Sequence, residues 1–311
     1  MRCALCGNTT FTTITNKLRH NISRKVVQCG RCSLVSLKNP LSNTIDYSAK
    51  EYRKLHSAVM GKSLSPKEMF DSQIEFQKNR IIRIRKLLKP KSTVLEIGSS
   101  TGYFLFSVKD MVKKVVGIEL DPRHAEFARR YCKIEVHAKP LGETTLELQQ
   151  FDVIFMFQVF EHISNPLEFL SLCKKYLKPN GIIYIEVPNV NEALLSVYNI
   201  PSFHEFYYRE PHVYYYSEKT LCKILQKVGF IGNTKTIQEY TFFNHLHWLL
   251  TKKPQQDQND GYGIKKLTDT TGKNGKMLEK WLNQTNSKYQ RLLEHLGIGE
   301  HVCYIGKNVL K

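Results

Sequence analysis

Apolar and polar residues alternate along the chain with two periods. From Thr93 onward, short apolar runs that suit buried strands are followed by segments with apolar residues at helical spacing. The predicted strands are TVLEIG, KVVGIEL, KIEVHA, FDVIFMF and GIIYIEV, and the predicted helices are YFLFSVKDM, PRHAEFARRY and NPLEFLSLCKKYL. This alternation predicts an α/β fold with a doubly wound, Rossmann-like parallel sheet. Ligands bind such a sheet outside the carboxyl ends of its strands.

The segments on either side of this region have different patterns. Residues 66–89 carry apolar residues at near-helical spacing and predict a helix that ends before Pro90 and packs one face on the α/β domain. Residues 251–276 are polar and glycine-rich, which predicts a mobile loop. An amphipathic helix and a last strand, HVCYIGKN, are expected within 277–309 and should close the sheet.

Charge and composition narrow the range of partners. The 311 residues can bury an α/β core and one small additional module. A net charge of +18 favours polyanions such as RNA, anionic glycans or phosphate-bearing sugar nucleotides. We interpret the basic patch over 77–91 as the solvated face of an amphipathic helix. Without an apolar stretch near the roughly 20 residues of a membrane span, or a signal-peptide core, we expect a soluble cytoplasmic protein.

Four of the eight cysteines form two C-x2-C pairs separated by 22 residues: Cys3, Cys6, Cys29 and Cys32. Such pairs can present four thiolates to Zn²⁺ in a tetrahedron, with Gly7 and Gly30 assisting the tight turns. A disulfide alternative would need an oxidising compartment. Four thiolates leave no position open for a catalytic water, so the predicted zinc is structural. We therefore predict a zinc-ribbon-like module at 1–45, a linker at 46–66 and the main α/β domain at 67–311.

The first turn of the main domain, in VLEIGSSTGYF, indicates a nucleotide site. The G-x-G-x-x-G dinucleotide fingerprint would require glycine at Ser100 and Tyr103, so that interpretation fails. The spacing E-x-G-x-x-x-G is present instead, in Glu96, Gly98 and Gly102.

An acid follows this loop at the end of the second predicted strand. Glu119 lies 17 residues after Gly102 and can accept hydrogen bonds from both hydroxyls of a ribose. The next residue, Leu120, would offer an apolar side chain to an adenine face. Loop, acid and strand order together favour a nucleoside-containing cofactor.

Four stretches, VLEIGSSTGYF, VVGIELDP, FDVIFMFQVFEHISNPLEFL and LKPNGIIYIEVPN, resemble in order the motifs of class I S-adenosylmethionine-dependent methyltransferases. The resemblance covers residues 93–189. It implies that the glycine loop approaches the methionine part of the cofactor, the acid approaches the ribose, and the turn around Gln158 approaches the methyl-donor end. Asp152 is interpreted as structural. The residues expected to bind the cofactor are Glu96, Gly98, Ser99, Ser100, Gly102, Tyr103, Glu119, Leu120 and Gln158.

The cysteine-rich head and the loop together resemble a narrower group. Zinc-containing bacterial sugar methyltransferases that act on nucleotide-linked deoxysugars carry a four-Cys head and a loop of the form E-I-G-S-N-D-G, from which EIGSSTG departs at Ser100 and Thr101. The stretch NHLHWLL (244–250) resembles methyltransferases of surface-polysaccharide pathways. These resemblances imply an acceptor that is a sugar of a nucleotide-linked or surface-glycan precursor.

Methyl transfer needs two positioned reactants and, for a protonated nucleophile, a base. The candidates are His162, His212 and Glu210. His162 follows the fourth strand and is either catalytic or packs under the loop or caps the next helix. His212 lies in an H-x-x-Y-x-S setting that resembles related sugar enzymes.

In their carbon-methylating members an acid directly precedes that histidine, whereas Pro211 does so here. This difference weakens the case for carbon methylation and leaves oxygen or nitrogen methylation open. The tyrosines over 207–216 either stack on a sugar or fill a lid. Two other functions remain open: an RNA methyltransferase with a zinc module, and a non-catalytic cofactor-binding protein.

Overall fold

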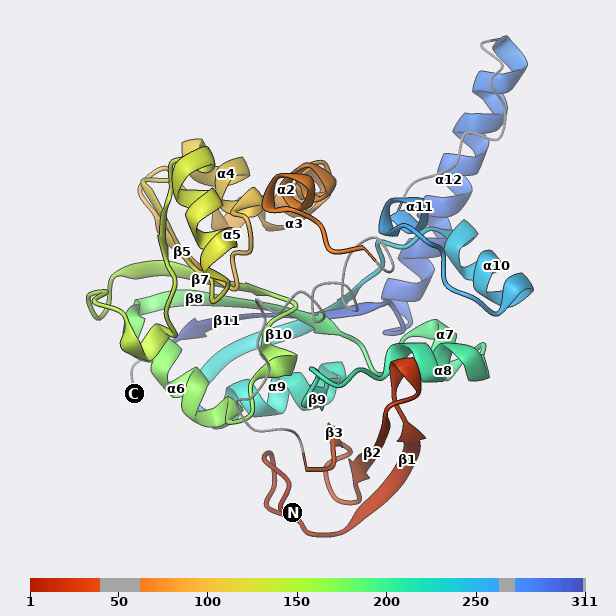
Figure 1. Ribbon diagram of the computed structural model, residues 1–311, viewed down its shortest axis with the longest axis horizontal. Helices are drawn as coiled ribbons and strands as arrows, with labels where there is room; N and C mark the ends of the chain where they lie inside the picture. Colours follow the sequence, from red (N-terminus) through yellow and green to blue (C-terminus); the bar gives the residue numbers. More distant parts are fainter. Residues whose placement is uncertain (40–61, 263–271, 310–311) are drawn as a thin grey trace. The chain divides into compact units, whose positions relative to one another are not determined.

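The computed structural model describes residues 1–39, 62–262 and 272–309. In this part of the chain the strands form two sheets (Figure 1). The four-stranded sheet has the order β1 (Phe11–Lys17), β2 (Ser23–Cys29), β3 (Val35–Leu37), β9 (Tyr214–Tyr215). The seven-stranded sheet has the order β10 (Phe230–Ile237), β11 (His301–Asn308), β8 (Leu177–Pro188), β7 (Phe151–Phe157), β4 (Thr93–Ile97), β5 (Lys114–Ile118), β6 (Glu135–His137).

The larger sheet confirms the predicted α/β architecture. Strand β4 pairs in parallel with both β5 and β7, and β7 pairs in parallel with β8. All five residues of β4 are buried, as expected for a central strand covered on both faces. The last strand, β11, coincides with the predicted HVCYIGKN and lies between β8 and β10.

Short helices connect the strands. Figure 1 shows α2 to α5 over one face of the strands β4 to β8 and α6 over the other. None of the helices in the described ranges combines the length and apolarity that crossing a membrane requires. The helices are α2 (Pro66–Ile74), α3 (Gln77–Ile84), α4 (Tyr103–Val108), α5 (Pro122–Phe127), α6 (Pro166–Tyr176), α7 (Ala193–Ser196), α8 (Pro201–Tyr207), α9 (Glu218–Lys227), α10 (Phe242–Thr251), α11 (Gln258–Tyr262) and α12 (Lys273–His295).

The helix predicted over 66–89 is divided into α2 and α3. Helix α2 begins with a capping box, in which Ser65 accepts from the backbone N–H of Glu68 and the Glu68 carboxylate accepts from that of Ser65. Phe70 is buried among three rings, with centroids 5.5 Å from Phe106 and 5.3 Å from Tyr131. The predicted packing of one helix face on the α/β domain is therefore confirmed.

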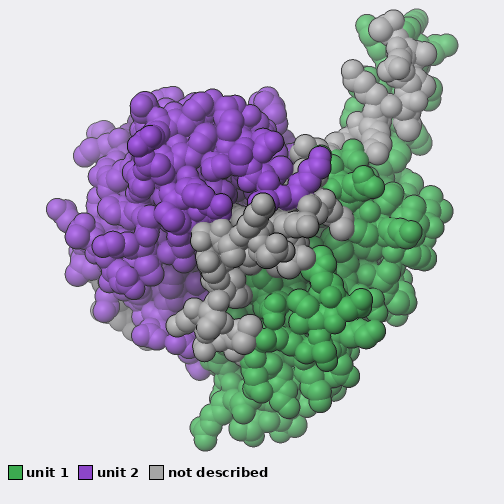
Figure 2. All heavy atoms as spheres, viewed as in Figure 1, with its two compact units in different colours: residues 1–40, 188–220, 234–303 green, residues 41–187, 221–233, 304–311 purple. Residues whose placement is uncertain are grey.

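The chain folds into two compact units, each built from segments that are distant in sequence (Figure 2). Unit 1 comprises residues 1–40, 188–220 and 234–303, and unit 2 comprises 41–187, 221–233 and 304–311. The cysteine-rich head thus belongs to the same unit as segments far from it along the chain. The domain boundaries at 45 and 67 stay predictions, and residues 46–61 of the predicted linker lie outside the described part.

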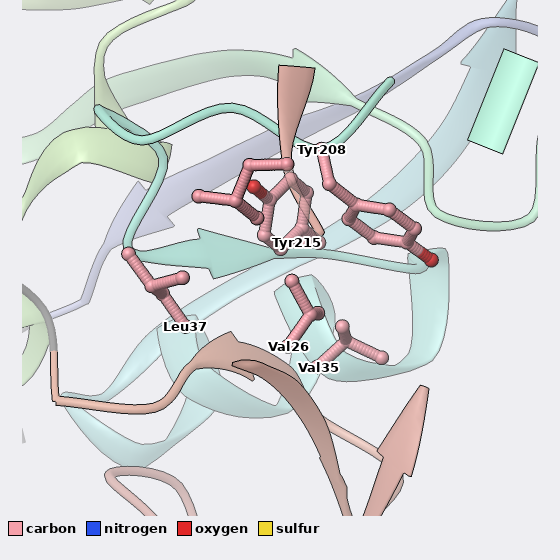
Figure 3. Packing of buried hydrophobic residues seen from close by; sticks show 6 residues of the cluster. Val26, Val35, Leu37, Tyr208 and Tyr215 are labelled. Carbon is pink, nitrogen blue, oxygen red and sulfur yellow. The ribbon is translucent and has the colours of Figure 1, made fainter. Parts of the chain in front are cut away.

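The core of unit 1 explains why these segments belong together. Strand β3 pairs with β9, so that Val35 lies opposite Tyr215. Figure 3 shows the two tyrosine rings facing the aliphatic side chains of the head. Burying one such valine or leucine contributes roughly 1.5–3 kcal/mol. The buried members of this cluster are Leu18, Val26, Val35, Leu37, Tyr208 and Tyr215.

Unit 1 also contains the C-terminal helices. Helix α11 lies inside the segment predicted as a loop over 251–276, of which residues 263–271 are outside the described part. Trp248 of α10 packs edge-on against Phe203 of α8, with ring centroids 4.8 Å apart. Helix α12 begins at Lys273, a few residues before the predicted start at 277.

Candidate functional site

The four head cysteines converge on one point in unit 1. Their Sγ atoms all lie within 4.8 Å of one another, with 3.5 Å between Cys3 and Cys32 and 3.5 Å between Cys6 and Cys29. All four are thiols. Zinc bound tetrahedrally at about 2.3 Å from each sulfur would place the sulfurs about 3.8 Å apart, so the donor set fits a structural zinc ion.

The turns around the cysteines supply hydrogen-bond donors. Gly7 has a φ of 73° and donates its N–H to the carbonyl of Cys3. The equivalent position after the second pair is Ser33, with a φ of 63°, so the expectation that Gly30 makes this turn is wrong. Burial alone would raise the pKa of Cys29, but backbone N–H groups and the amide of Asn8 lower this pKa to about 6.

The glycine loop of unit 2 is closed against its neighbours. Gly98 has a φ of 76°, and a Cβ there would lie 2.4 Å from Cγ2 of Val159. Gly102 has a φ of 80°, and a Cβ there would lie 2.8 Å from Cδ1 of Ile134. Both glycines are therefore required by backbone conformation and by space. The N–H groups of Gly98 and Ser99 donate to the carbonyl of Ile118, which ties the loop to β5.

Glu119 is held by the loop that it faces. Its carboxylate accepts from the N–H of Ser100 at 2.7 Å and from the N–H of Asp121 at 2.7 Å. A carboxylate offers about four lone-pair sites and can accept hydrogen bonds from both hydroxyls of a ribose. The following side chain, Leu120, is 47% exposed and is available to an apolar ligand face.

Ser100 occupies the position where a dinucleotide loop has glycine. Its φ is 48°, in the left-handed region that is costly for residues with a Cβ. Its Oγ lies 3.3 Å from Nδ1 of His124, and its N–H is bonded to Glu119. The hydroxyl groups of Ser99 and Thr101 are buried and have no hydrogen-bond partner among the residues that the structure describes.

Glu96 is a buried acid below the loop. Burial raises its pKa to about 8, although Arg80 acts in the opposite direction. Its Oε2 has no hydrogen-bond partner within the described ranges. Burial and the charge of Glu96 also raise the pKa of Tyr103 to about 12. A cationic ligand group near this acid would favour its ionised form.

Two arginines of α3 are half-buried and pair with a buried carboxylate, contrary to the expectation of a solvated basic face. Arg80 and Arg83 lie 3.4 Å and 3.9 Å from the carboxylate of Glu186, which has no exposed side-chain area. The guanidinium of Arg80 also lies 4.2 Å from the ring centroid of Phe157. The interpretation as a solvated face is wrong for these two residues because β8 supplies a buried counter-charge.

The turn after β7 also has left-handed backbone. Gln158 has a φ of 56° and donates its N–H to the carbonyl of Glu186. Asp152, at the start of β7, accepts from the N–H of Thr93 and pairs with Lys178 at 2.8 Å. The structural interpretation of Asp152 is therefore confirmed.

The candidate bases belong to different units. His162 ends a 3-10 helix in unit 2, and its Nε2 lies 3.8 Å from the buried carboxylate of Glu161. The N-cap of the next helix is Asn165, so His162 does not cap that helix. His212 and Glu210 belong to unit 1. Glu210 pairs with Arg24 at 3.2 Å.

His212 is buried beside a buried tyrosine. It is 8% exposed, and its ring centroid lies 5.7 Å from that of Tyr215. The Tyr215 hydroxyl donates to the carbonyl of Arg209 and accepts from its N–H. Ser217, the residue before α9, accepts with its Oγ from the N–H of Thr220 and so caps this helix. Among the tyrosines in this stretch, the buried ones fill the core: Tyr208, Tyr214, Tyr215 and Tyr216.

Some residues of the candidate site carry no signal in the sequence. A Cβ at Gly117 would lie 2.6 Å from the Ser99 hydroxyl, so a glycine in β5 makes room for the loop. Val159 covers Gly98, and His124 bonds Ser100. The sequence does show that Arg80 and Arg83 are three residues apart, and this spacing places them on one face of the helix.

These features define an α/β Rossmann-like enzyme of the class I S-adenosylmethionine-dependent methyltransferases. The sequence model of a methyltransferase-domain family matches residues 70–232, more than half of the chain. The chain belongs to this family, whose cofactor is S-adenosylmethionine.

Curated relatives agree on the class and differ in what they act on. A "Probable S-adenosylmethionine-dependent methyltransferase" of Mycolicibacterium smegmatis is 32% identical over 97 residues, 31% of this chain and 38% of that protein. A ubiquinone biosynthesis O-methyltransferase of Cereibacter sphaeroides is 28% identical over 103 residues, 32% of this chain and 42% of that protein. The chain spans about two fifths of the length of these relatives.

Solved structures share the fold. A SAM-dependent methyltransferase from Archaeoglobus fulgidus has a TM-score of 0.51 at 22% identity, over 78% of this chain and 97% of that one. Phosphoethanolamine N-methyltransferase 2 of Haemonchus contortus, in complex with S-adenosyl-L-methionine, has a TM-score of 0.51 at 15% identity, over 89% of this chain and 63% of that one.

Proposed function

We propose that this methyltransferase transfers its methyl group to an oxygen or nitrogen atom on a sugar of a nucleotide-linked or surface-glycan precursor. The observation that carries this proposal is the construction of unit 1. The segment with the motif His212-x-x-Tyr215-x-Ser217 is built onto the cysteine-rich head through the β3–β9 pairing. The two sequence features that resemble sugar methyltransferases thus belong to one packed core.

The loop of unit 2 is the proposed cofactor site. Gly98, Ser99, Ser100 and Gly102 would surround the methionine part, with Glu96 and Tyr103 below the loop. Glu119 would accept the ribose hydroxyls, Leu120 would contact the adenine, and Gln158 would lie at the methyl-donor end. The exposed Leu120 and the position of the Glu119 carboxylate, bonded to the backbone of the loop, support this assignment.

Acceptor activation is proposed for a histidine. His212 would remove the acceptor proton or bind the acceptor, and His162 is the second candidate, oriented by Glu161. Glu210 is the weakest of the three candidates because it pairs with Arg24. Zinc at the four cysteines would hold the head and take no part in the reaction.

A methyl-transfer assay with the full chain tests the function. We expect labelled methyl from S-adenosylmethionine to appear on members of a panel of nucleotide-linked sugars and not on total RNA. Labelled RNA would replace the proposal by the RNA-methyltransferase alternative, which the net charge of +18 also suits. If calorimetry shows no binding of S-adenosylmethionine, both the sugar-methyltransferase proposal and the RNA-methyltransferase alternative fail.

The base is tested in the same assay with His212→Ala. If His212 is the base, the variant should bind the cofactor with wild-type affinity and lose roughly 100-fold or more in kcat. A matched His162→Ala variant separates the two candidates. Full turnover by the His212 variant would remove this residue from the mechanism.

A further inference from the structure

Unit 1 contains an arginine whose charge is buried without a counter-charge among the described residues. Arg19 lies two residues after the end of β1, and its Nε donates to the carbonyl of Phe206 at 2.7 Å. Its guanidinium carbon lies 3.3 Å from the centroid of the Phe206 ring. Its Nη2 is buried and has no hydrogen-bond partner within residues 1–39, 62–262 and 272–309. The guanidinium therefore has a hydrogen bond at Nε and a stacking contact with Phe206, while the N–H groups of the buried Nη2 have no acceptor among the described residues.

A second arginine lies near the same phenylalanine ring. The guanidinium carbon of Arg209 is 5.8 Å from the centroid of the same Phe206 ring. Its backbone is fixed because its N–H and carbonyl both bond the buried hydroxyl of Tyr215. In the described part of the chain, neither Arg19 nor Arg209 forms an ion pair with a carboxylate. By contrast, Arg24 of the same unit has Glu210 as a partner.

Two half-buried cations near each other are unfavourable without an anion. Burial and the charge of Arg209 lower the pKa of Arg19 to about 7, whereas Tyr240 and Tyr215 act in the opposite direction. None of these neighbouring groups is a carboxylate. The turn that carries Arg19 is itself strained, since His20 and Asn21 have φ values of 64° and 59°. An unfavourable like-charge interaction and a strained backbone therefore occur together at Arg19.

We infer that Arg19 and Arg209 form a binding site for the phosphate groups of the acceptor. The two guanidinium groups offer several N–H donors that suit phosphate oxygens, and the Phe206 ring covers one face of the Arg19 guanidinium. The choice of phosphate over carboxylate rests on the proposed function, because nucleotide-linked sugars carry a diphosphate. The existence of an anion site rests only on the two arginines.

Thermal unfolding of the full chain with inorganic pyrophosphate tests this site. Saturating S-adenosylhomocysteine is present throughout, so that the probe does not enter the cofactor loop. We expect pyrophosphate to raise the Tm of the wild type and of Arg291→Gln, an exposed arginine of α12 in the same unit. Arg19→Gln and Arg209→Gln should weaken the pyrophosphate Kd by roughly ten- to a hundredfold.

Arg209→Gln also separates a binding role from a structural one. Removal of a like charge should raise the Tm of the protein without pyrophosphate, and the variant should fall below the wild type when pyrophosphate is saturating. Arg19→Lys keeps the positive charge at position 19, so it can replace Arg19→Gln in this comparison if Arg19→Gln does not fold. An unshifted wild type, or an Arg209→Gln variant that pyrophosphate stabilises as strongly as the wild type, overturns the assignment.

Acceptor kinetics distinguish this inference from the proposed function. If pyrophosphate binds through the arginines and no nucleotide-linked sugar is methylated, the anion site stands and the sugar proposal fails. If a nucleotide-linked sugar is methylated with the same KM by Arg209→Gln and by the wild type, the function stands and the phosphate site fails. The expected result is a KM raised roughly tenfold or more with kcat little changed.

Discussion

Replacement of Gly98 by alanine tests how tightly the loop is closed. Gly98 has a φ of 76°, and a Cβ on its backbone would lie 2.4 Å from Cγ2 of Val159 and 3.6 Å from Cβ of Val159. The first distance is far below the 3.5–4.0 Å at which two carbon atoms attract each other. The side chain that is closest belongs to the turn after β7, so the variant should disturb two loops together.

The expected destabilisation has two parts. A left-handed backbone costs a residue with a Cβ roughly 1–2 kcal/mol. Forcing one extra methyl group into occupied space costs roughly 1–3 kcal/mol. The free energy of unfolding of Gly98→Ala should therefore fall by about 2–5 kcal/mol. Since Val159 is only half-buried, part of the overlap can be relieved by its movement, which favours the lower half of this range.

A double-mutant cycle in denaturant separates the two parts. Val159→Ala alone should cost about 1 kcal/mol, because it removes two half-buried methyl groups. In the double variant the overlap is gone, so it should be more stable than the sum of the single effects by about 1–3 kcal/mol. Gly142→Ala is the matched control, since its nearest atom would be an ordinary 3.4 Å away. Strict additivity of Gly98→Ala and Val159→Ala would refute the steric argument.

Three further results are expected. Because Glu96 has a pKa of about 8, it ionises progressively as the pH rises from 5.5 to 7.5, and a cationic cofactor bound near it should bind up to roughly tenfold more tightly per pH unit over this range. In Glu96→Gln, calorimetry should show a cofactor affinity that no longer changes with pH. Burial raises the pKa of Glu192 well above 4.5, so the stability that protonated Glu192 contributes is lost as the pH rises above about 4.5. The Tm of Glu192→Gln should therefore exceed the wild-type Tm by a margin that grows from pH 5 to 8, and a Tm difference that stays constant with pH would contradict this expectation. Chelation should remove one zinc ion per chain and lower the Tm without changing cofactor affinity, and Cys32→Ser should copy this effect; loss of cofactor binding on chelation would argue against a purely structural metal.

Periodicity and spacing predicted the elements that depend on local sequence. The buried runs in β4, β5 and β7 have the apolar continuity that a parallel sheet requires, and the last strand has the predicted bounds. The four cysteines were identifiable because metal-ligand spacing is a local property. The acid Glu119 was identifiable because its distance from Gly102 follows from one strand–helix–strand unit.

Contacts between distant segments were not predictable in this way. Strand β9 has two residues and no period, yet its pairing with β3 joins the head to the segment around His212. The basic patch on α3 has the polar pattern of a solvated face, and only the position of Glu186 in β8 makes the half-buried Arg80 the partner of a buried carboxylate. Pairs of this kind are brought together by the tertiary fold, and neither residue of a pair carries a local sequence pattern that predicts the other.

Ser100 shows why a fingerprint loop can depart from glycine at one position and not at another. A Cβ at Gly98 or Gly102 would overlap a side chain packed over the loop, so another residue there strains the backbone and must displace a neighbour. Ser100 shares their left-handed backbone, but its side chain has space, and its Oγ lies 3.3 Å from His124. Its N–H is bonded to the Glu119 carboxylate, so the conformation that costs the serine free energy is the one that orients the acid. The constraint at position 100 is therefore on the backbone N–H, whereas at positions 98 and 102 it is on volume as well. A loop with serine there can keep the acid in place as well as glycine would, and this accounts for the departure without any loss of the site.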